Sequence, residues 1–202
     1  MDLDAVEVRV LGCLIEKQRT TPDVYPLSLN SLRAACNQST NRDPVVAYDE
    51  ATIRDALHRL ARRRWTRFAS GARAAKYRHL LDENPGLSVD QQALLAVLML
   101  RGPQTPGELR QRVERLYAFR EGELEATLET LMERGFVARH ERRPGQKEER
   151  YGHRLSEDLE DEPEAAPVAV ANDGPPPESR IDRLEREVAE LKRQVAELLG
   201  KE

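Results

Sequence analysis

Basic side chains crowd one stretch of the sequence, and their chemistry suits the binding of phosphate. Between Arg54 and Arg78 the chain carries nine Lys or Arg residues and a single acid, Asp55. Cations that neutralise backbone phosphates release condensed counterions, which is the main source of non-specific affinity for DNA. The stretch therefore predicts a surface that binds double-stranded DNA. The candidate residues are Arg54, His58, Arg59, Arg62, Arg63, Arg73, Lys76 and Arg78.

The net charge changes sign along the chain. Residues 1–80 carry a net charge of +5, residues 81–154 carry −1 and residues 155–202 carry −8, which together give the overall −4. A basic region within an acidic protein marks the place where a nucleic-acid partner is expected to bind. That place is the first part of the chain.

The element that must position these side chains is a helix followed by a hairpin. After Asp49, a good N-cap, apolar residues recur at the spacing of one helix face. This stripe consists of Ile53, Ala56, Leu57, Leu60 and Ala61. Arg54, His58 and Arg62 then fall on the opposite, solvent-facing side. Beyond this helix, "WTRFAS" and "RAAKYRHL" around a Gly turn predict two short strands.

Acidic residues at the front of this helix argue against DNA binding. In helix-turn-helix docking the first turns approach the base edges. Here those turns and the preceding loop carry Asp43, Asp49, Glu50 and Asp55, which repel phosphates. The alternative is that the arginines form a solvated face of a protein–protein interaction scaffold that makes no contact with nucleic acid. The sequence leaves both functions open.

The order of predicted elements occurs twice. Two helices, within residues 5–17 and 29–36, precede the helix that follows Asp49. Capping boxes at Ser88 and Thr105 open two helices of a second set, which again ends in a hairpin. Three helices and a hairpin are typical of a winged helix-turn-helix. The sequence therefore predicts a mainly α fold with short β-hairpins (α+β), made of two tandem winged helix-turn-helix domains and a C-terminal helix.

Composition sets the expected boundaries. We expect winged-helix domains at residues 1–82 and 83–155, an acidic, Pro-rich linker at 156–178 and a heptad helix at 179–202. The second domain is the poorer DNA-binding candidate, because its third helix is acidic. Its five glutamates are Glu121, Glu123, Glu125, Glu129 and Glu133. We expect this domain to contact protein or to mediate dimerisation.

The last helix has the spacing of a parallel two-stranded coiled coil. Its apolar residues alternate between steps of three and four, with Leu at every d position. They are Ile181, Leu184, Val188, Leu191, Val195 and Leu198. The sequence predicts a homodimer formed through this coil. The alternative is a helix that packs back on its own chain.

Other chemistries lack a sequence signal. The two cysteines and four histidines show no metal-binding spacing, and Cys13 lies in an apolar run typical of a buried thiol. No Gly-rich phosphate loop, nucleophile elbow or HExxH motif occurs. The sequence thus predicts a protein that is not an enzyme and holds no cofactor or metal. No apolar run has membrane-spanning length and no signal peptide is recognisable, so a cytoplasmic protein without a membrane partner is expected.

A polar segment, "CNQSTNRDPV", separates the second and third predicted helices. Pro44 disfavours a helical Asp43, so the second helix must end before it. Asn41 and Asp43 can bond to their own backbone in Asx turns. Arg42 could pair with Asp43 or Asp49, and an exposed pair of this kind contributes only about 0–1 kcal/mol. The motif loop Asn37, Asn41, Arg42, Asp43 and Pro44 thus predicts mainly a scaffold that sets the angle of the third helix; the alternative is that it contacts the same partner as that helix. Whether it covers the front of the third helix stays open.

Several strings carry a resemblance to a known family. "RVLGCLIEKQRTTPDVYPLSLNSLRAACNQSTNRDPVVAYDE", "LRGPQTPGELR" and "RPGQKEERYGH" resemble the YceH family of bacterial proteins, over about residues 6–155. The resemblance implies two winged-helix domains and no particular activity. The chain departs from the family in "SGARAAKYRH" and "RRRWTR", where relatives tend to carry a Val and a Gly. Both changes make the region of the first hairpin more basic or less apolar.

Overall fold

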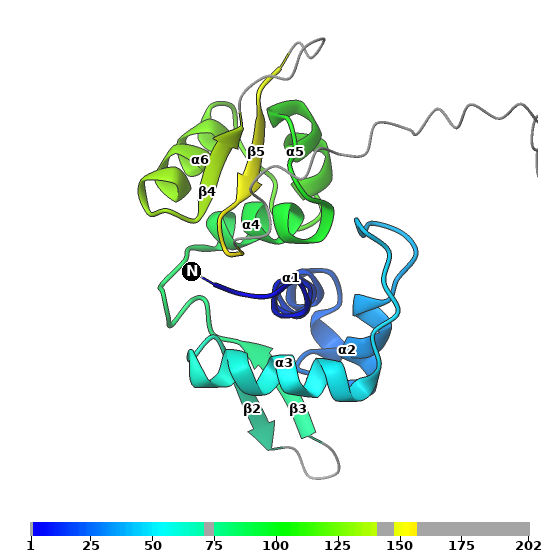
Figure 1. Cartoon of the computed structure of the whole chain (residues 1–202). Coiled ribbons are helices and arrows are strands. Elements are labelled where there is room, and N and C mark those ends of the chain that lie inside the picture. Colours follow the sequence, from blue (N-terminus) through cyan, green and yellow to red (C-terminus); the bar gives the residue numbers. More distant parts are fainter. Residues whose placement is uncertain (1, 71–74, 141–147, 157–202) are drawn as a thin grey trace, which may run out of the picture. The chain divides into compact units, whose positions relative to one another are not determined.

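The computed structural model describes residues 2–70, 75–140 and 148–156. These residues belong to one compact unit, which spans residues 1–161. The fold is mixed α+β, with helices and two small antiparallel sheets (Figure 1). Three sequence predictions lie outside the described residues, namely the position of Arg73, the linker and the coil residues 181–198. The predicted domain boundary near residue 82 stays a prediction.

The first half of the unit contains three helices and a hairpin. Its elements are α1 (Ala5–Thr20), a short 3-10 helix (Pro22–Val24), β1 (Leu27–Ser28), α2 (Leu29–Cys36), α3 (Glu50–Arg62), β2 (Thr66–Ser70) and β3 (Ala75–His79). The strand order is β1-β3-β2. β1 was not predicted, because two residues are too short for a visible alternation. It pairs Leu27 with Tyr77 at the edge of the hairpin.

The second half repeats the order of helices and hairpin. Its elements are α4 (Val89–Arg101), α5 (Pro106–Val113), α6 (Glu123–Glu133), β4 (Val137–His140) and β5 (Arg150–His153). The two strands pair antiparallel, with Val137 opposite His153. The predicted sequence of three helices followed by two strands is therefore present in both halves.

Side-chain caps fix where four of the helices begin, and those at Asp49, Ser88 and Thr105 were predicted from the sequence. The side chain of Ser28 accepts a hydrogen bond from the Ser31 amide at 3.2 Å, and that of Asp49 accepts one from Thr52 at 2.8 Å. Ser88 and Thr105 each form a capping box. Such caps satisfy amide groups that have no partner within the helix and contribute about 1 kcal/mol each.

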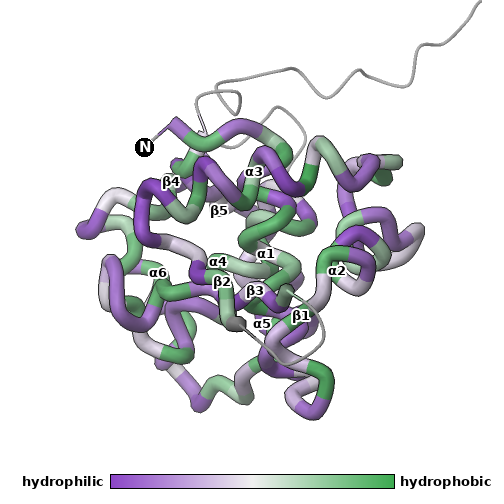
Figure 2. The backbone as a smooth tube through the Cα atoms, turned by 90° about the horizontal axis from the view of Figure 1, so that it is seen from below, coloured by the Kyte–Doolittle hydropathy of each residue, from purple (hydrophilic) through white to green (hydrophobic). Residues whose placement is uncertain are grey.

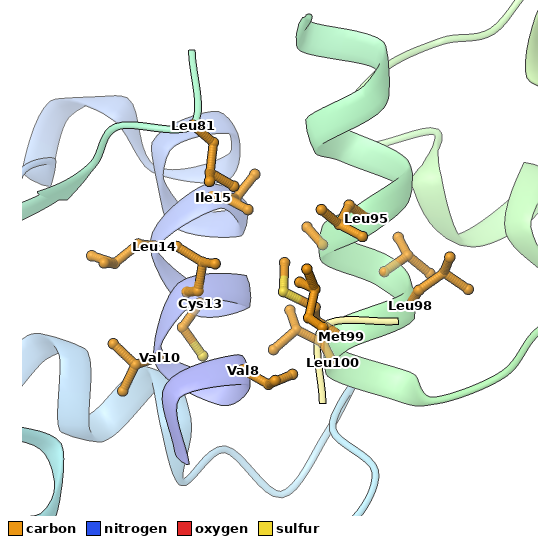
Figure 3. Packing of buried hydrophobic residues seen from close by; sticks show 14 of the residues in the cluster. Val8, Val10, Cys13, Leu14, Ile15, Leu81, Leu95, Leu98, Met99 and Leu100 are labelled. Carbon is orange, nitrogen blue, oxygen red and sulfur yellow. The ribbon is translucent and has the colours of Figure 1, made fainter. Parts of the chain in front are cut away.

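One apolar core spans both halves, with α1 and α4 at its centre. Hydrophobic colour is concentrated along these two helices, whereas α3 alternates between polar and apolar residues (Figure 2). Figure 3 shows the side chains of both helices meeting between them. At this contact a Cβ on Gly12 would lie 3.0 Å from Cδ2 of Leu100. The absence of a side chain at Gly12 therefore allows the two helices to approach closely.

Both cysteines are buried free thiols, which confirms the prediction for Cys13. Within the described ranges no group of three or more His, Cys, Asp or Glu side chains is arranged to hold a metal ion. No helix in this part of the chain is long and apolar enough to cross a membrane.

Candidate nucleic-acid interface

Helix α3 buries one face and exposes the face that the sequence assigned to DNA. Its stripe of Ile53, Ala56, Leu57 and Leu60 is buried in the core. Because the helix repeats every 3.6 residues, Arg54, Asp55, His58 and Arg62 lie on the other side, and all four are exposed. Ala61, which was assigned to the stripe, is also exposed. The apolar stripe thus ends at Leu60, and solvent reaches the end of the helix.

A shallow hollow runs along this exposed face. It is open to solvent, has a volume of about 430 Å³ and is lined by Asp55, His58, Arg59 and Arg62. These residues are spaced three and four apart, so their side chains form one continuous row on the helix. Three of the four are basic residue types, which makes the hollow suitable for an extended anionic partner.

Two of the predicted arginines are engaged by the N-terminal segment instead. Arg59 forms an ion pair with Asp4 and lies 3.6 Å from a carboxylate oxygen of Glu7. Arg63 donates a hydrogen bond of 2.7 Å to the backbone carbonyl of Asp2. Both side chains therefore fasten the start of the chain to α3, and they are less available to phosphate than the sequence suggested.

The acids at the front of α3 are also engaged. Asp49 caps the helix, and the hydrogen bonds from Thr52 lower the pKa of its carboxyl group. Glu50 lies 3.8 Å from Arg54 and the same distance from Arg33. The repulsion expected from these acids is therefore reduced by local cations, although Asp55 remains exposed in the hollow.

The hairpin presents its cations on one face. Arg67 pairs with Arg78 across β2 and β3, and Ala69 pairs with Lys76, so the side chains of these residues share a face. Glu83 lies 3.5 Å from Arg67 and also forms an ion pair with Arg78. Among the residues that the structure describes, no ion pair engages Arg62 or Lys76. Among the predicted Lys and Arg candidates, these two are therefore the ones left available to an external anion; Arg64, which was not a candidate, is also exposed and forms no ion pair in the described residues.

Two buried arginines, Arg9 and Arg42, anchor the motif loop, whereas Asn41, Asp43 and Pro44 are exposed. Arg9, in α1, donates hydrogen bonds to the carbonyls of Cys36 at 3.3 Å and Pro44 at 2.6 Å. Asn37 exchanges hydrogen bonds of 2.8 and 2.9 Å with the backbone of Tyr48. Asn41 adopts a φ of 60°, a left-handed conformation that Asn tolerates better than most residues.

The prediction that Arg42 pairs with Asp43 or Asp49 was wrong. Its guanidinium donates to the two carboxylate oxygens of Glu16, at 3.4 and 2.6 Å, and to the Ala35 carbonyl at 3.0 Å. The pair is buried, whereas pairing with Asp43 or Asp49 would have been exposed. Burial opposes ionisation of Glu16, but the hydrogen bonds and charge of Arg42 outweigh it and lower the pKa.

The loop leaves the front of α3 open. Its buried contacts are made toward α1 and toward α4, where the Asp43 amide donates to the Leu100 carbonyl at 2.8 Å. Ala51, Arg54 and Asp55 stay exposed. Figure 1 shows the loop rising from α2 toward α5, away from the exposed side of α3.

Sequence reasoning missed the roles of Arg9 and Glu16. Both lie in "VRVLGCLIEK", within the first predicted helix. A charged side chain in an otherwise apolar helix is a signal of a buried partner, because an unpaired buried charge is very costly. The signal was present, but the partner lies 26 residues away for Glu16 and could not be named from it.

Comparison with known proteins places most of the chain in one family. The family described as "Protein of unknown function, DUF480" matches residues 3–146. The chain is 49% identical over 193 residues to a UPF0502 protein of Solibacter usitatus, covering 95% of this chain and 93% of the relative. It is 46% identical over 208 residues to a UPF0502 protein of Pectobacterium atrosepticum, covering 98% of each.

Proposed function

The chain belongs to the DUF480 family of UPF0502 proteins, the YceH-like family that its motifs resemble, and we propose that it binds double-stranded DNA. In this proposal each half of the fold is a winged helix-turn-helix. α3 is the recognition helix and the β2–β3 hairpin is the wing. The protein acts without catalysis, as a DNA-binding regulator of transcription in the cytoplasm.

The observation that carries the proposal is the pair of available cations on two neighbouring elements. Arg62 ends α3, and Lys76 lies on β3 of the hairpin that follows it. Arg54 and His58 extend the same exposed side of α3 toward its start. Cations on a helix and on an adjoining hairpin can contact the two phosphate backbones that border one groove.

The arrangement favours contact with the backbone over the reading of bases. Arg and Lys supply the phosphate contacts that dominate non-specific affinity. The exposed Asp55 next to His58 can accept a hydrogen bond from a cytosine amino group, but it repels phosphate. We therefore expect moderate affinity with weak sequence preference and strong salt dependence.

Titration of a fluorescently labelled duplex of mixed sequence with the full chain tests the proposal. Fluorescence anisotropy should rise at low salt, and an unlabelled duplex should compete. A flat titration at low salt would overturn the proposal.

A protein–protein scaffold is the second candidate, and one observation favours it. Phe68 on β2 is 55% exposed, and its ring stands edge-on to Tyr77 at a centroid distance of 5.9 Å. Exposed aromatic side chains are enriched at protein interfaces. A pull-down from nuclease-treated lysate should recover a partner that Phe68→Ala loses, if the hairpin contacts protein.

Dimerisation through residues 181–198 is compatible with either function. Truncation at residue 178 should then change the oligomer measured in solution from a dimer to a monomer.

A further inference from the structure

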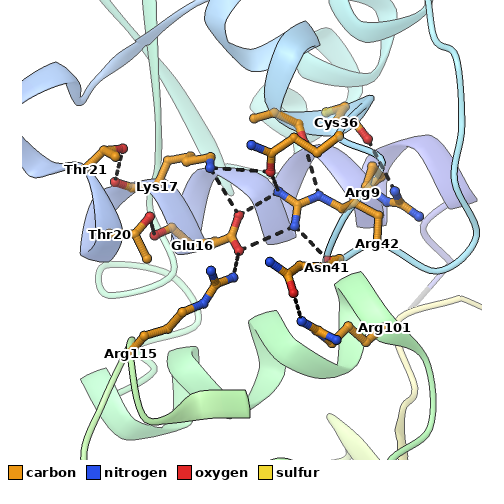
Figure 4. Close-up of polar contacts among 12 residues, drawn as sticks. Arg9, Glu16, Lys17, Thr20, Thr21, Cys36, Asn41, Arg42, Arg101 and Arg115 are labelled. Atoms are coloured by element: carbon orange, nitrogen blue, oxygen red, sulfur yellow. Dashed lines mark hydrogen bonds and ion pairs between the residues drawn. The ribbon is translucent and has the colours of Figure 1, made fainter.

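A second group of cations gathers around a single carboxylate, away from the exposed face of α3. Glu16, near the end of α1, is contacted by Arg42, by Arg115 and by Lys17 (Figure 4). Arg101, the last residue of α4, donates a hydrogen bond to the side-chain oxygen of Asn41 beside them. The group joins α1, the motif loop, the end of α4 and the turn that follows α5.

The charges in this group do not balance. Four cationic side chains (Lys17, Arg42, Arg101 and Arg115) face one carboxylate, which leaves an excess of three positive charges. A further cation, Arg112, borders the group, and it lies 3.8 Å from Glu108. Partial burial and the neighbouring charges of Arg112 and Arg115 lower the pKa of Arg101. In the described parts of the chain, no carboxylate forms an ion pair with Arg101.

The inner part of the group is rigid and the outer part is accessible. Arg42 is fully buried, and its guanidinium is held by Glu16, Gln38 and backbone carbonyls. Arg115 is 47% exposed at its side chain, and Arg101 and Lys17 are partly exposed. Solvent therefore reaches the guanidinium and ammonium groups, which are held in place by Glu16 and Asn41.

We propose that Arg101, Arg115 and Lys17 form a binding site for a compact, multiply charged phosphate anion, such as pyrophosphate or the phosphates of a nucleotide. Arginine donates to phosphate oxygens through a planar fork, and lysine adds a point charge. Arg115 and Lys17 converge on one carboxylate, with Arg101 beside them on Asn41, rather than forming a row. This geometry fits a small polyanion better than a duplex, whose phosphates are spread along a backbone.

Such a ligand would link the two halves of the fold. Lys17 belongs to α1, whereas Arg101 and Arg115 belong to the second half. The anion would supply the negative charge that Glu16 alone does not provide, so its binding stabilises the folded state by mass action. Pyrophosphate should therefore raise the unfolding temperature of the full chain.

Isothermal titration calorimetry of the full chain at low salt tests the site. The probes are orthophosphate, pyrophosphate and ATP, which separate the bare anion from a nucleotide. We expect pyrophosphate or ATP to bind, and Arg101→Ala to weaken that binding at least tenfold. Arg112→Ala, which removes only a bordering charge, should weaken it less. Arg110→Ala is the matched control, because Arg110 also lies on α5 but pairs at 2.9 Å with Glu125.

Three results would overturn the proposal. They are no binding of any phosphate probe to the wild type, equal weakening by Arg110→Ala, and loss of duplex binding in Arg101→Ala as large as the loss of pyrophosphate binding. The last result would assign the group to a DNA surface. Arg62→Ala separates this site from the proposed function, because it should weaken duplex binding and leave pyrophosphate binding unchanged.

Discussion

The guanidinium of Arg42 and the carboxylate of Glu16 form a buried bidentate ion pair, with nitrogen–oxygen distances of 3.4 and 2.6 Å. This pair fastens the loop between α2 and α3 to α1. The remaining donors of Arg42 bond to Ala35, Gln38 and Asn41. The polar segment between α2 and α3 is therefore held in place by two buried arginines, Arg42 and Arg9.

Removal of Arg42 should destabilise the fold strongly. Arg42→Ala leaves a buried carboxylate without its main partner, and breaking such a pair costs about 3–5 kcal/mol. Urea unfolding followed by circular dichroism measures the change in the free energy of unfolding. Arg110→Ala, which breaks an exposed pair, should cost less than about 1 kcal/mol. Similar losses in both variants would show that the Arg42 pair contributes no more than a surface contact.

A side chain at Gly12 should separate α1 from α4. Gly12→Val places atoms against Leu100 and Met99, where a Cβ alone would already lie 3.0 and 3.2 Å from its neighbours. Overpacking of a core costs about 1–3 kcal/mol, even though Val is a better helix former than Gly. Thermal unfolding should show a lower midpoint for this variant. Gly107→Val is the control, since a Cβ at Gly107 meets nothing within 4 Å; an unchanged midpoint for Gly12→Val would contradict the close approach.

His79 should make stability depend on pH. Burial, with a smaller effect of the charges on Arg19 and Arg78, lowers its pKa to about 4. The unfolded chain, with a His pKa of about 6.5, takes up the proton first as the pH falls. The contribution of buried, neutral His79 to the free energy of unfolding is therefore fully present above about pH 6.5. It is lost as the pH falls from that value to about 4. At pH 5 the loss amounts to about 2 kcal/mol for this one residue.

Paired substitutions check the contribution of His79. The drop in the free energy of unfolding between pH 7 and pH 5 should be about 2 kcal/mol smaller in His79→Gln than in the wild type. His58→Gln, at an exposed position of α3, should show the wild-type drop. His153 has a pKa lowered to about 4 by burial and by His140, so part of the drop should persist in both variants. An identical drop in His79→Gln would contradict the assignment.

Local chemistry made much of the fold predictable. Asp49, Ser88 and Thr105 mark helix starts because a cap acts within three residues of itself. The apolar stripe of α3 predicted its buried face, since periodicity reports burial directly. These signals are local, and they gave the order of helices and hairpins in both halves.

The pairing of charges was not predictable in the same way. Arg42 pairs with Glu16, 26 residues away, and Arg59 pairs with Asp4, 55 residues away. Such contacts depend on tertiary packing. Counting arginines therefore overstated the free positive charge on α3. Of the predicted Lys and Arg side chains that the structure describes, Arg62 and Lys76 form no ion pair or side-chain hydrogen bond. Arg54, Arg59 and Arg78 form ion pairs, and Arg63 donates a hydrogen bond to a backbone carbonyl.

The dependence of duplex binding on salt tests the proposed function most directly. Four to five phosphate contacts predict a slope of roughly −4 in a plot of log K against log salt concentration. Arg54→Ala combined with Arg62→Ala should weaken binding and flatten the slope by about 2, since each lost contact removes about 0.9. Arg110→Ala should keep the wild-type slope. Absence of binding by the wild type at low salt, or an unchanged slope in the double variant, would contradict the assignment of DNA binding to α3.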